Sequence, residues 1–132
     1  MARKTVKRTR AKPVDKRRQG SAVLKKIGWG TNEGLREIDE ELWALTLENN
    51  FGAIWSRPGL SLRDREMICI AALVTLGANG VGAHFRNAHA VGLTNAELKE
   101  IILQVMPYAG LPKALHAMNI FKKVVAGEAT TL

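Results

Sequence analysis

Apolar residues recur along this chain every three or four positions, which is the spacing that places them on one face of an α-helix. One such stripe begins after residue 34 and consists of Leu35, Ile38, Leu42 and Leu45. A later stripe consists of Leu98, Ile101, Ile102, Val105 and Met106. No convincing alternation of apolar and polar residues, the mark of a half-buried β-strand, accompanies them. The pattern therefore predicts an all-α fold.

Glycines and prolines divide this pattern into about six helices with short links. We expect helices over about 16–27, 35–49, 61–76, 82–91, 94–107 and 112–126, with residues 51–60 as a connecting loop. Ser61 and Thr94 have the spacing of N-terminal caps, the second with the TxxE capping box. Pro107 is expected to break or kink its helix, and Pro112 to be the first residue of the last one.

The stretch MICIAALVTL, residues 67–76, is apolar almost all round. A helix of this kind must be covered on nearly every side, so we expect it to be the central element. Three tryptophans also need cover in a small domain with a limited interior. Self-association is the simplest source of the extra burial.

The length of 132 residues has room for one domain, and 46% hydrophobic residues suffice for one core. The net charge of +8 belongs to one end of the chain, because residues 1–18 hold nine Lys and Arg against Asp15 alone. We therefore divide the chain into a basic, disordered tail (1–18) and a helical domain (19–132). The tail is most simply a solvated extension; a transit-like segment or an anion-attracting arm are the alternatives.

The charge distribution and the cysteine count restrict the class of protein further. Residues 19–132 are electrically neutral, which argues against a nucleic-acid-binding face and leaves only non-specific contact by the tail. A single cysteine, Cys69, excludes a disulfide framework within the chain. No apolar run reaches the roughly 18 residues of a membrane span. We expect a soluble protein of a reducing compartment, the cytoplasm.

The segment GANGVGAHFRNAHAVG, residues 77–92, contains the most informative candidate residue. The residues four and seven positions after His84 are apolar, so its imidazole leans toward the apolar side of a helix, whereas His89 lies on another face. A histidine there is either a hydrogen-bonded core residue or a general acid or base, because its ordinary pKa lies near neutrality. For His116, on the last predicted helix, a structural role is the simpler interpretation.

Metal and cofactor chemistry have little support in the sequence. His84 and His89 are about 140° apart around a helix, so they cannot chelate one ion together. Signatures for a Ser/His/Asp triad, a phosphate loop or a dinucleotide fold are not found. We expect neither a metal nor a cofactor.

Arginines near residue 60 offer a further clue. Arg57 follows Trp55 in the expected loop, and Arg63 and Arg65 lie in the first turns of the next helix. A planar guanidinium is suited to bidentate binding of a carboxylate. Each of these arginines, taken singly, is more simply interpreted as a surface or ion-pair residue. Convergence on His84 would distinguish the two interpretations.

At these residues the sequence resembles the carboxymuconolactone decarboxylase family, within the alkylhydroperoxidase D-like superfamily. The resemblance covers about residues 17–125. It is carried by IWSRPGLSLRDRE (54–66), by the histidine eight residues before a helix-ending glycine (His84 and Gly92), by the TxxEL cap, and by YAGxP at 108–112. It implies an all-helical subunit of a ring-shaped homohexamer and a decarboxylation of 4-carboxymuconolactone that uses no cofactor.

The same resemblance implies roles for individual residues. His84 would be the proton donor or the partner of an oxyanion. Arg57, with Arg65 or Arg86, would hold substrate carboxylates. Trp55 and Tyr108 would form the walls of the pocket. The partner is thus a small carboxylated lactone or a similar anionic metabolite, in the breakdown of aromatic compounds.

Two departures from the family pattern keep other functions open. Thiol peroxidase relatives carry a CxxC pair before the histidine, where this chain has GANGVGA, so disulfide chemistry within one chain is not expected. Decarboxylase relatives often carry a glutamate at the position of Ala53, and if that glutamate assists proton transfer, its loss would remove or redirect the activity. The alternatives are a non-catalytic or divergent member that binds an anionic metabolite, and a peroxidase-like protein that uses Cys69 with an external thiol. The apolar neighbours of Cys69 disfavour the latter.

Overall fold

The computed structural model describes residues 12–130, which form helices and no strand. In chain order these are α1 (Lys16–Lys26), α2 (Glu33–Ile38), α3 (Glu40–Leu45), the π-helix η1 (Thr46–Trp55), α4 (Leu62–Leu76), α5 (Val81–Asn87), the 3₁₀-helix η2 (Ala88–Val91), α6 (Asn95–Ala109) and α7 (Leu111–Val125). The prediction of a single all-α domain is confirmed. The described chain has seven α-helices rather than about six.

The extra helix arises at Asp39, where the expected second helix is interrupted. Asp39 has an extended backbone (φ −162°, ψ 122°), and its carboxylate accepts a hydrogen bond of 2.6 Å from the backbone N–H of Leu42. Aspartate competes in this way with helical hydrogen bonding and is favoured as an N-cap. The residue therefore ends α2 and begins α3.

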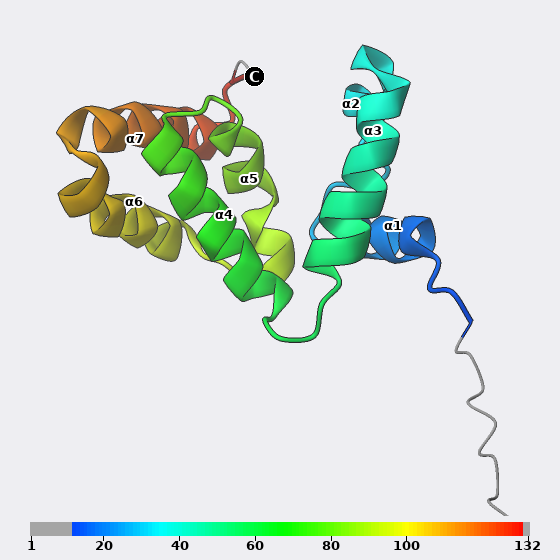
Figure 1. Ribbon diagram of the computed structural model, residues 1–132. Helices are drawn as coiled ribbons and strands as arrows, with labels where there is room; N and C mark the ends of the chain where they lie inside the picture. The colour runs from blue at the N-terminus through cyan, green and yellow to red at the C-terminus, as the bar shows by residue number, and fades with distance from the viewer. Residues whose placement is uncertain (1–11, 131–132) are drawn as a thin grey trace, which may run out of the picture.

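The helices form two groups joined by the segment 56–61 (Figure 1). The N-terminal group contains α1, α2, α3 and η1, and the C-terminal group contains α4 to α7. Each group has its own cluster of buried apolar residues. Leu62, Cys69 and Val91 of the C-terminal group pack against the N-terminal cluster. The two groups therefore meet at α4 and η2.

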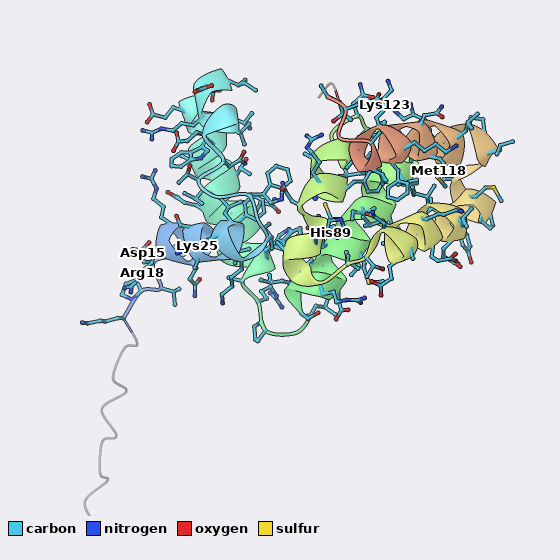
Figure 2. All side chains as sticks on the ribbon, turned by 180° about the vertical axis from the view of Figure 1, so that it is seen from behind. Asp15, Arg18, Lys25, His89, Met118 and Lys123 are labelled. Carbon is cyan, nitrogen blue, oxygen red and sulfur yellow. The ribbon has the colours of Figure 1, made fainter. Side chains whose placement is uncertain are left out.

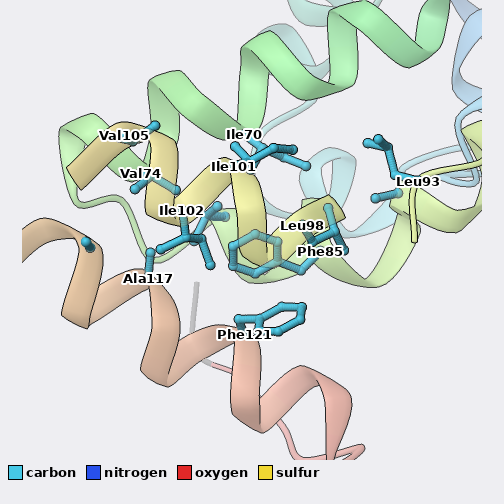
Figure 3. Packing of buried hydrophobic residues seen from close by; sticks show 13 residues of the cluster. Ile70, Val74, Phe85, Leu93, Leu98, Ile101, Ile102, Val105, Ala117 and Phe121 are labelled. Atoms are coloured by element: carbon cyan, nitrogen blue, oxygen red, sulfur yellow. The ribbon is translucent and has the colours of Figure 1, made fainter. Parts of the chain in front are cut away.

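The larger core lies among α4 to α7 (Figure 3). Phe85 of α5 and Phe121 of α7 meet edge to face, with ring centroids 5.5 Å apart. Ile70 of α4 and Ile102 of α6 are completely buried in the same cluster. Burying side chains of this size stabilises a fold by roughly 1.5–3 kcal/mol each. This core fixes α4 and α5, the two helices that position the candidate site.

The smaller core depends on a close approach of α1 to η1. A Cβ atom added at Gly20 would lie 2.2 Å from the carbonyl oxygen of Leu47, and one added at Gly52 would lie 2.1 Å from that of Lys16. Both backbones are in contact there, so neither position has room for a side chain. This contact supports Phe51 and Trp55, which are buried against α1 in the N-terminal cluster.

The prediction that residues 51–60 form a loop is wrong in its first half. The helix continues through Phe51 and ends only at Trp55, as the π-helix η1. Asn49 and Asn50 are weak helix formers, which suggested an end there. Burial of Phe51, Gly52 and Trp55 against α1 overrides that local preference.

Pro107 does not end its helix either, since α6 runs on to Ala109. A proline removes one backbone hydrogen bond, and this one lies in the last turn, where the remaining helix is short. Pro112 is the second rather than the first residue of α7, which begins at Leu111. Both deviations concern helix ends and leave the packing of α6 on α7 intact.

The predicted caps are confirmed. The hydroxyl of Ser61 accepts a 3.0 Å hydrogen bond from the backbone N–H of Asp64, and Thr94 with Glu97 forms the full capping box. Gly77 and Gly92 end their helices in the left-handed conformation, with φ of 69° and 83°. These local signals therefore fix where α4 and α6 begin and where α4 and η2 end.

Coverage of α4 within one chain is incomplete. Ile70 and Val74 are buried, but Ile68 is 56% and Leu76 70% exposed. The expected burial on nearly every side is therefore absent within one chain. A groove of about 440 Å³ between α4 and α6 runs beside this face, and its lining includes Met67, Ile68, Ala71, Ile101 and Val105.

Residues 1–11 of the expected tail lie outside the described residues, so its disorder stays a prediction. Its last residues, Lys16–Arg18, begin α1, where Asp15 acts as the N-cap. Figure 2 shows Arg18 and Lys25 on α1 at one end of the molecule and Lys123 on α7 at the other. The labelled basic side chains therefore do not form one cluster. Among residues 12–130, no helix is long and apolar enough to cross a membrane.

The α1–η1 contact predicts opposite effects of two glycine substitutions. Gly20→Ala should destabilise the protein by about 1–3 kcal/mol, because its Cβ would overlap backbone atoms of η1. Gly34→Ala is the matched control, since Gly34 lies in α2 with no atom near its added Cβ. It should stabilise by about 0.5–1 kcal/mol through helix propensity. Chemical denaturation of both variants measures this, and equal effects would contradict the contact.

Candidate functional site

A pocket of about 390 Å³ lies where η1 of the N-terminal group faces α4 and α5 of the C-terminal group. Its walls are mostly apolar, and its polar side chains come from η1, α4 and α5. The lining residues are Asn50, Phe51, Ile54, Trp55, Leu60, Arg65, Ile68, Cys69 and His84. Segments far apart in the sequence thus meet around one small space, which is the usual setting of a ligand site.

His84 forms the centre of a three-residue cluster in this pocket. Its Nδ1 lies 2.7 Å from Oε1 of Glu66, and Sγ of Cys69 lies 3.8 Å from both ring nitrogens. Glu66 is only 1% exposed, and the side chain of His84 is 14% exposed. We name these three residues the His84 cluster. A carboxylate, an imidazole and a thiol are thereby held together at the edge of an apolar pocket.

The pKa of His84 is governed by opposing effects. Burial alone would lower it, because a charged imidazolium loses hydration. Hydrogen bonding to Cys69 and to Glu66, together with the electrostatic interaction with both groups, outweighs burial and raises the pKa of His84 to about 9. At neutral pH the ring therefore carries a proton. Perturbed histidines of this kind in a pocket are typical of acid–base sites.

Local sequence explains why these side chains meet. Glu66 and Ile70 lie one helical turn apart, so both occupy the inner face of α4. Gly82 lets α5 approach α7 closely, since a Cβ there would lie 3.0 Å from Ile120. The ring of Trp29, from the segment after α1, lies 4.9 Å from the His84 ring. The cluster thus joins α4, α5 and the N-terminal group.

Three buried side-chain atoms in the described chain lack a hydrogen-bond partner, and all three belong to residues around this pocket. They are Oε2 of Glu66, Nε1 of Trp29 and Nε of Arg65. Leaving such an atom unsatisfied costs about 1–3 kcal/mol, so proteins retain few of them. Their concentration beside His84 marks a site where unmet hydrogen-bonding capacity is built into the fold.

Among the predicted arginines, Arg65 lines this pocket and Arg57 does not. Arg65 donates a 2.9 Å hydrogen bond from its guanidinium to the backbone carbonyl of Arg57. Arg57 lines a neighbouring hollow of about 250 Å³, which shares Trp55 and Leu60 with the main pocket. Trp55 lies in the wall of both. The structure therefore brings His84, Arg65 and Trp55 together in one pocket and places Arg57 in the neighbouring hollow.

The remaining predicted site residues lie elsewhere in the subunit. Arg86 donates a hydrogen bond of 2.5 Å to Oγ1 of Thr130 and, with His89, lines a separate hollow of about 230 Å³. Tyr108 is 83% exposed near the end of α6. His116 lies 3.1 Å from Asn79, an exposed contact that fits its structural interpretation. Within one chain no described contact links Arg86 or Tyr108 to the pocket, and their roles stay predictions.

Sequence reasoning missed the part that Glu66 plays. Glu66 closes the RxRE motif and comes directly before the apolar stretch of α4. An acidic residue one turn before Ile70 on a buried helix face was the signal that could have identified it. The structure also supplies a carboxylate beside His84 although Ala53 occupies the position where decarboxylase relatives often have a glutamate.

Cys69 is also placed differently from the expectation of a cysteine buried in an apolar run. It is half-buried, lines the pocket and contacts His84. The i,i+3 spacing from Glu66 to Cys69 puts both on the side of α4 that faces α5. In residues 12–130 no group of three His, Cys, Asp or Glu side chains could hold a metal ion.

Comparison with known proteins identifies the family. Residues 40–123 match the sequence model of the carboxymuconolactone decarboxylase family. The chain is 36% identical over 93 residues to a 4-carboxymuconolactone decarboxylase from Acinetobacter baylyi, covering 70% of this chain and 69% of that protein. This chain belongs to the carboxymuconolactone decarboxylase family. The matched region contains Glu66, Cys69 and His84, the whole His84 cluster.

Two further relatives are similar to this chain, and the name of one of them gives a different substrate. The nitrosuccinic acid decarboxylase npaB of Metarhizium robertsii is 30% identical over 96 residues, which cover 72% of this chain and 62% of that protein. An uncharacterized 15.0 kDa protein of Paracoccus denitrificans is 34% identical over 85 residues, covering 62% of this chain and 63% of its own length. The names of the two characterised relatives share decarboxylation and differ in substrate.

The raised pKa of His84 predicts a stability that declines in alkaline solution. The folded pKa of about 9 lies above the ordinary 6.5, so the stabilisation is complete below pH 6.5 and is lost as the pH rises through 9. We expect the free energy of unfolding to fall by roughly 1–3 kcal/mol over this range. Urea denaturation at pH 6 and pH 10 measures it.

The reference for this measurement is the double variant Glu66→Gln/His84→Gln, which removes the pair without leaving a buried carboxylate alone. Other titrating groups affect the double variant and the native protein alike, so the difference between them isolates the cluster. A difference that stays constant from pH 6 to pH 10 would contradict the raised pKa of His84.

Proposed function

We propose that this protein is a cofactor-independent decarboxylase of a small carboxylated lactone of the 4-carboxymuconolactone type, in the catabolism of aromatic compounds. The observation that carries the proposal is the His84 cluster in an apolar pocket that also contains Arg65. Membership of the carboxymuconolactone decarboxylase family supports the reaction class. The names of the relatives differ in substrate, so the lactone itself belongs to the proposal.

The proposed decarboxylation requires a group that delivers a proton to carbon, and it requires no cofactor. Loss of carbon dioxide from the γ carbon of an unsaturated lactone leaves a dienolate whose charge is delocalised onto the lactone oxygen. The enzyme must stabilise this oxyanion and return a proton to carbon. His84 holds a proton at neutral pH, and because Nδ1 faces Glu66, its Nε2–H is the group available for donation. Glu66 keeps the ring oriented throughout.

Arg65 is the proposed anchor for the substrate carboxylate. It contributes to the pocket wall and retains an unsatisfied Nε–H. A guanidinium paired with a carboxylate forms strong charge-assisted hydrogen bonds, which are stronger still between apolar walls. Arg57, in the adjoining hollow, is the proposed contact for a second carboxylate. Trp55 separates the two positions and packs against the ring of the substrate.

The proposal predicts that His84→Gln lowers kcat for 4-carboxymuconolactone about 10²–10⁴-fold, because the proton donor is lost. Carbon dioxide release from the lactone, followed directly, measures this. His89→Gln is the matched control, since His89 follows α5 closely but lines a different hollow. It should stay within about twofold of the native kcat.

Arg65→Gln is measured in the same assay and should raise KM by about 10-fold or more, the value of a charge-assisted hydrogen bond. Circular dichroism of each variant confirms that the helices are retained. Full turnover by a folded His84→Gln protein would refute the assigned role and leave binding of an anionic metabolite as the function.

We also propose that the subunits assemble into the homohexamer that the family resemblance implies. The support is the exposed apolar side chains of α4 and α6, which include Ile68, Leu76, Leu103 and Met106, and the α4–α6 groove that Ile68 lines. Monomeric proteins rarely leave large apolar patches uncovered. The cytoplasmic location expected from the sequence stays a proposal alongside it.

The assembly proposal predicts that Ile68→Glu lowers the oligomeric state, because a carboxylate would enter the apolar contact. Sedimentation equilibrium gives the mass of the native and variant assemblies. Lys99→Glu, a charge change on α6 at an exposed position, is the control and should leave the mass unchanged. A native protein that sediments as a 14.5 kDa monomer would contradict the proposal.

A further inference from the structure

We propose that Cys69 is a second reactive centre in this pocket, a nucleophilic thiol that adds covalently to α,β-unsaturated carbonyl compounds. The choice of this class of electrophile rests on the proposed function, because an unsaturated lactone belongs to it. The reactivity of the thiol does not, since it depends only on the geometry of the His84 cluster.

The first support is the position of the sulfur. Sγ of Cys69 lies 3.8 Å from both nitrogens of His84, within hydrogen-bonding distance for sulfur. The residue is half-buried and lines the pocket, whereas an inert structural cysteine is sealed in a core. A small molecule that enters the pocket therefore meets the sulfur directly.

The second support is the carboxylate behind the imidazole. Glu66 is almost completely buried, contacts Nδ1 of His84 through Oε1, and has no partner for Oε2. A buried carboxylate favours the protonated imidazole, and a protonated imidazole favours the thiolate beside it. A nucleophile, its base and an orienting carboxylate thus occur in the order that activates nucleophiles in enzymes. The raised pKa of His84 agrees with this charge distribution.

The third support is the character of the walls. Phe51, Ile54 and Leu60 contribute apolar surface to the pocket that Cys69 lines, and Arg65 adds one positive charge. This lining suits a compact planar molecule with a carbonyl or carboxylate group. Cys69 is the sole cysteine of the chain, so an adduct rather than an intramolecular disulfide is the product open to it.

The proposed step is balanced without any further reactant. The step starts from the thiolate of Cys69 beside the protonated His84, the charge arrangement in which the thiol proton already lies on the imidazole. The thiolate attacks the β carbon of the C=C bond. A sulfur–carbon bond forms as the π bond breaks, and its electrons move to the α carbon and the carbonyl oxygen. His84 then returns the proton to the α carbon. The thiol has been added across the double bond, and nothing is oxidised or reduced.

The test is the pH dependence of alkylation by N-ethylmaleimide, measured by intact-protein mass spectrometry from pH 5.5 to 9. The single cysteine assigns every adduct to Cys69. The same chain unfolded in guanidinium gives the reference, where an ordinary thiol is about 1% ionised at pH 6.5. We expect the native profile to reach half its maximal rate at least one pH unit lower. That shift is a gain of about tenfold in thiolate fraction at pH 6.5.

Variants and a second electrophile complete the experiment. Glu66→Gln and His84→Gln should move the profile back toward that of the unfolded chain, whereas His89→Gln should leave it in place. The unsubstituted lactone 2(5H)-furanone should form a one-to-one adduct in the native protein at pH 6.5 and at least tenfold less in the folded His84→Gln variant.

Coincident native and unfolded profiles would overturn the proposal, and so would the absence of a furanone adduct. The comparison of native with unfolded protein needs no variant, so it remains decisive if a substitution prevents folding. None of these measurements depends on carbon dioxide release. A protein without decarboxylase activity can therefore still show the reactive thiol, and the reverse outcome is equally distinguishable.

Discussion

The hydrogen bond between Glu66 and His84 is the interaction on which the rest of this structure depends. A nearly fully buried carboxylate is tolerated only when a partner compensates for its lost hydration. His84 is that partner, and it comes from a different helix. The bond therefore fixes α4 against α5 at one register, and the contact of Trp29 with the imidazole extends the same constraint to the N-terminal group.

The protonated imidazole of His84 contacts two acidic groups, the carboxyl of Glu66 and the thiol of Cys69. Glu66 holds it from the interior, and Cys69 lies at the pocket side. In the two proposals, the same environment that keeps a proton on His84 for delivery to carbon activates the thiol next to it. The proposed acid–base chemistry and the proposed thiol chemistry would then depend on a single charge arrangement. Apolar walls strengthen both, because few water molecules compete for these groups.

The sequence predicted those features whose causes are local. The beginnings of α4 and α6 follow from the caps Ser61 and Thr94, and α4 and η2 end at glycines in the left-handed conformation. Such caps and turns depend on only a few adjacent residues. The extension of η1 to Trp55 was not predictable in this way, since it depends on packing against α1. The same reason separates Arg65 from Arg57. The family resemblance implied Arg57 first and Arg65 only as an alternative, and the tertiary arrangement puts Arg65 rather than Arg57 into the pocket.

Helix α4 is apolar almost all round because one side of it lies in the core and the other lines the site pocket and the α4–α6 groove. Its inner face carries Glu66, Ile70 and Val74 into the core, and Ile68 on its outer side lies both in the site pocket and in the α4–α6 groove. A neighbouring subunit seated in that groove would brace the helix that carries Glu66 and Cys69. Assembly and site chemistry would then be coupled through one helix, because any shift of α4 changes the distances to His84 on which both the proton and the thiol depend.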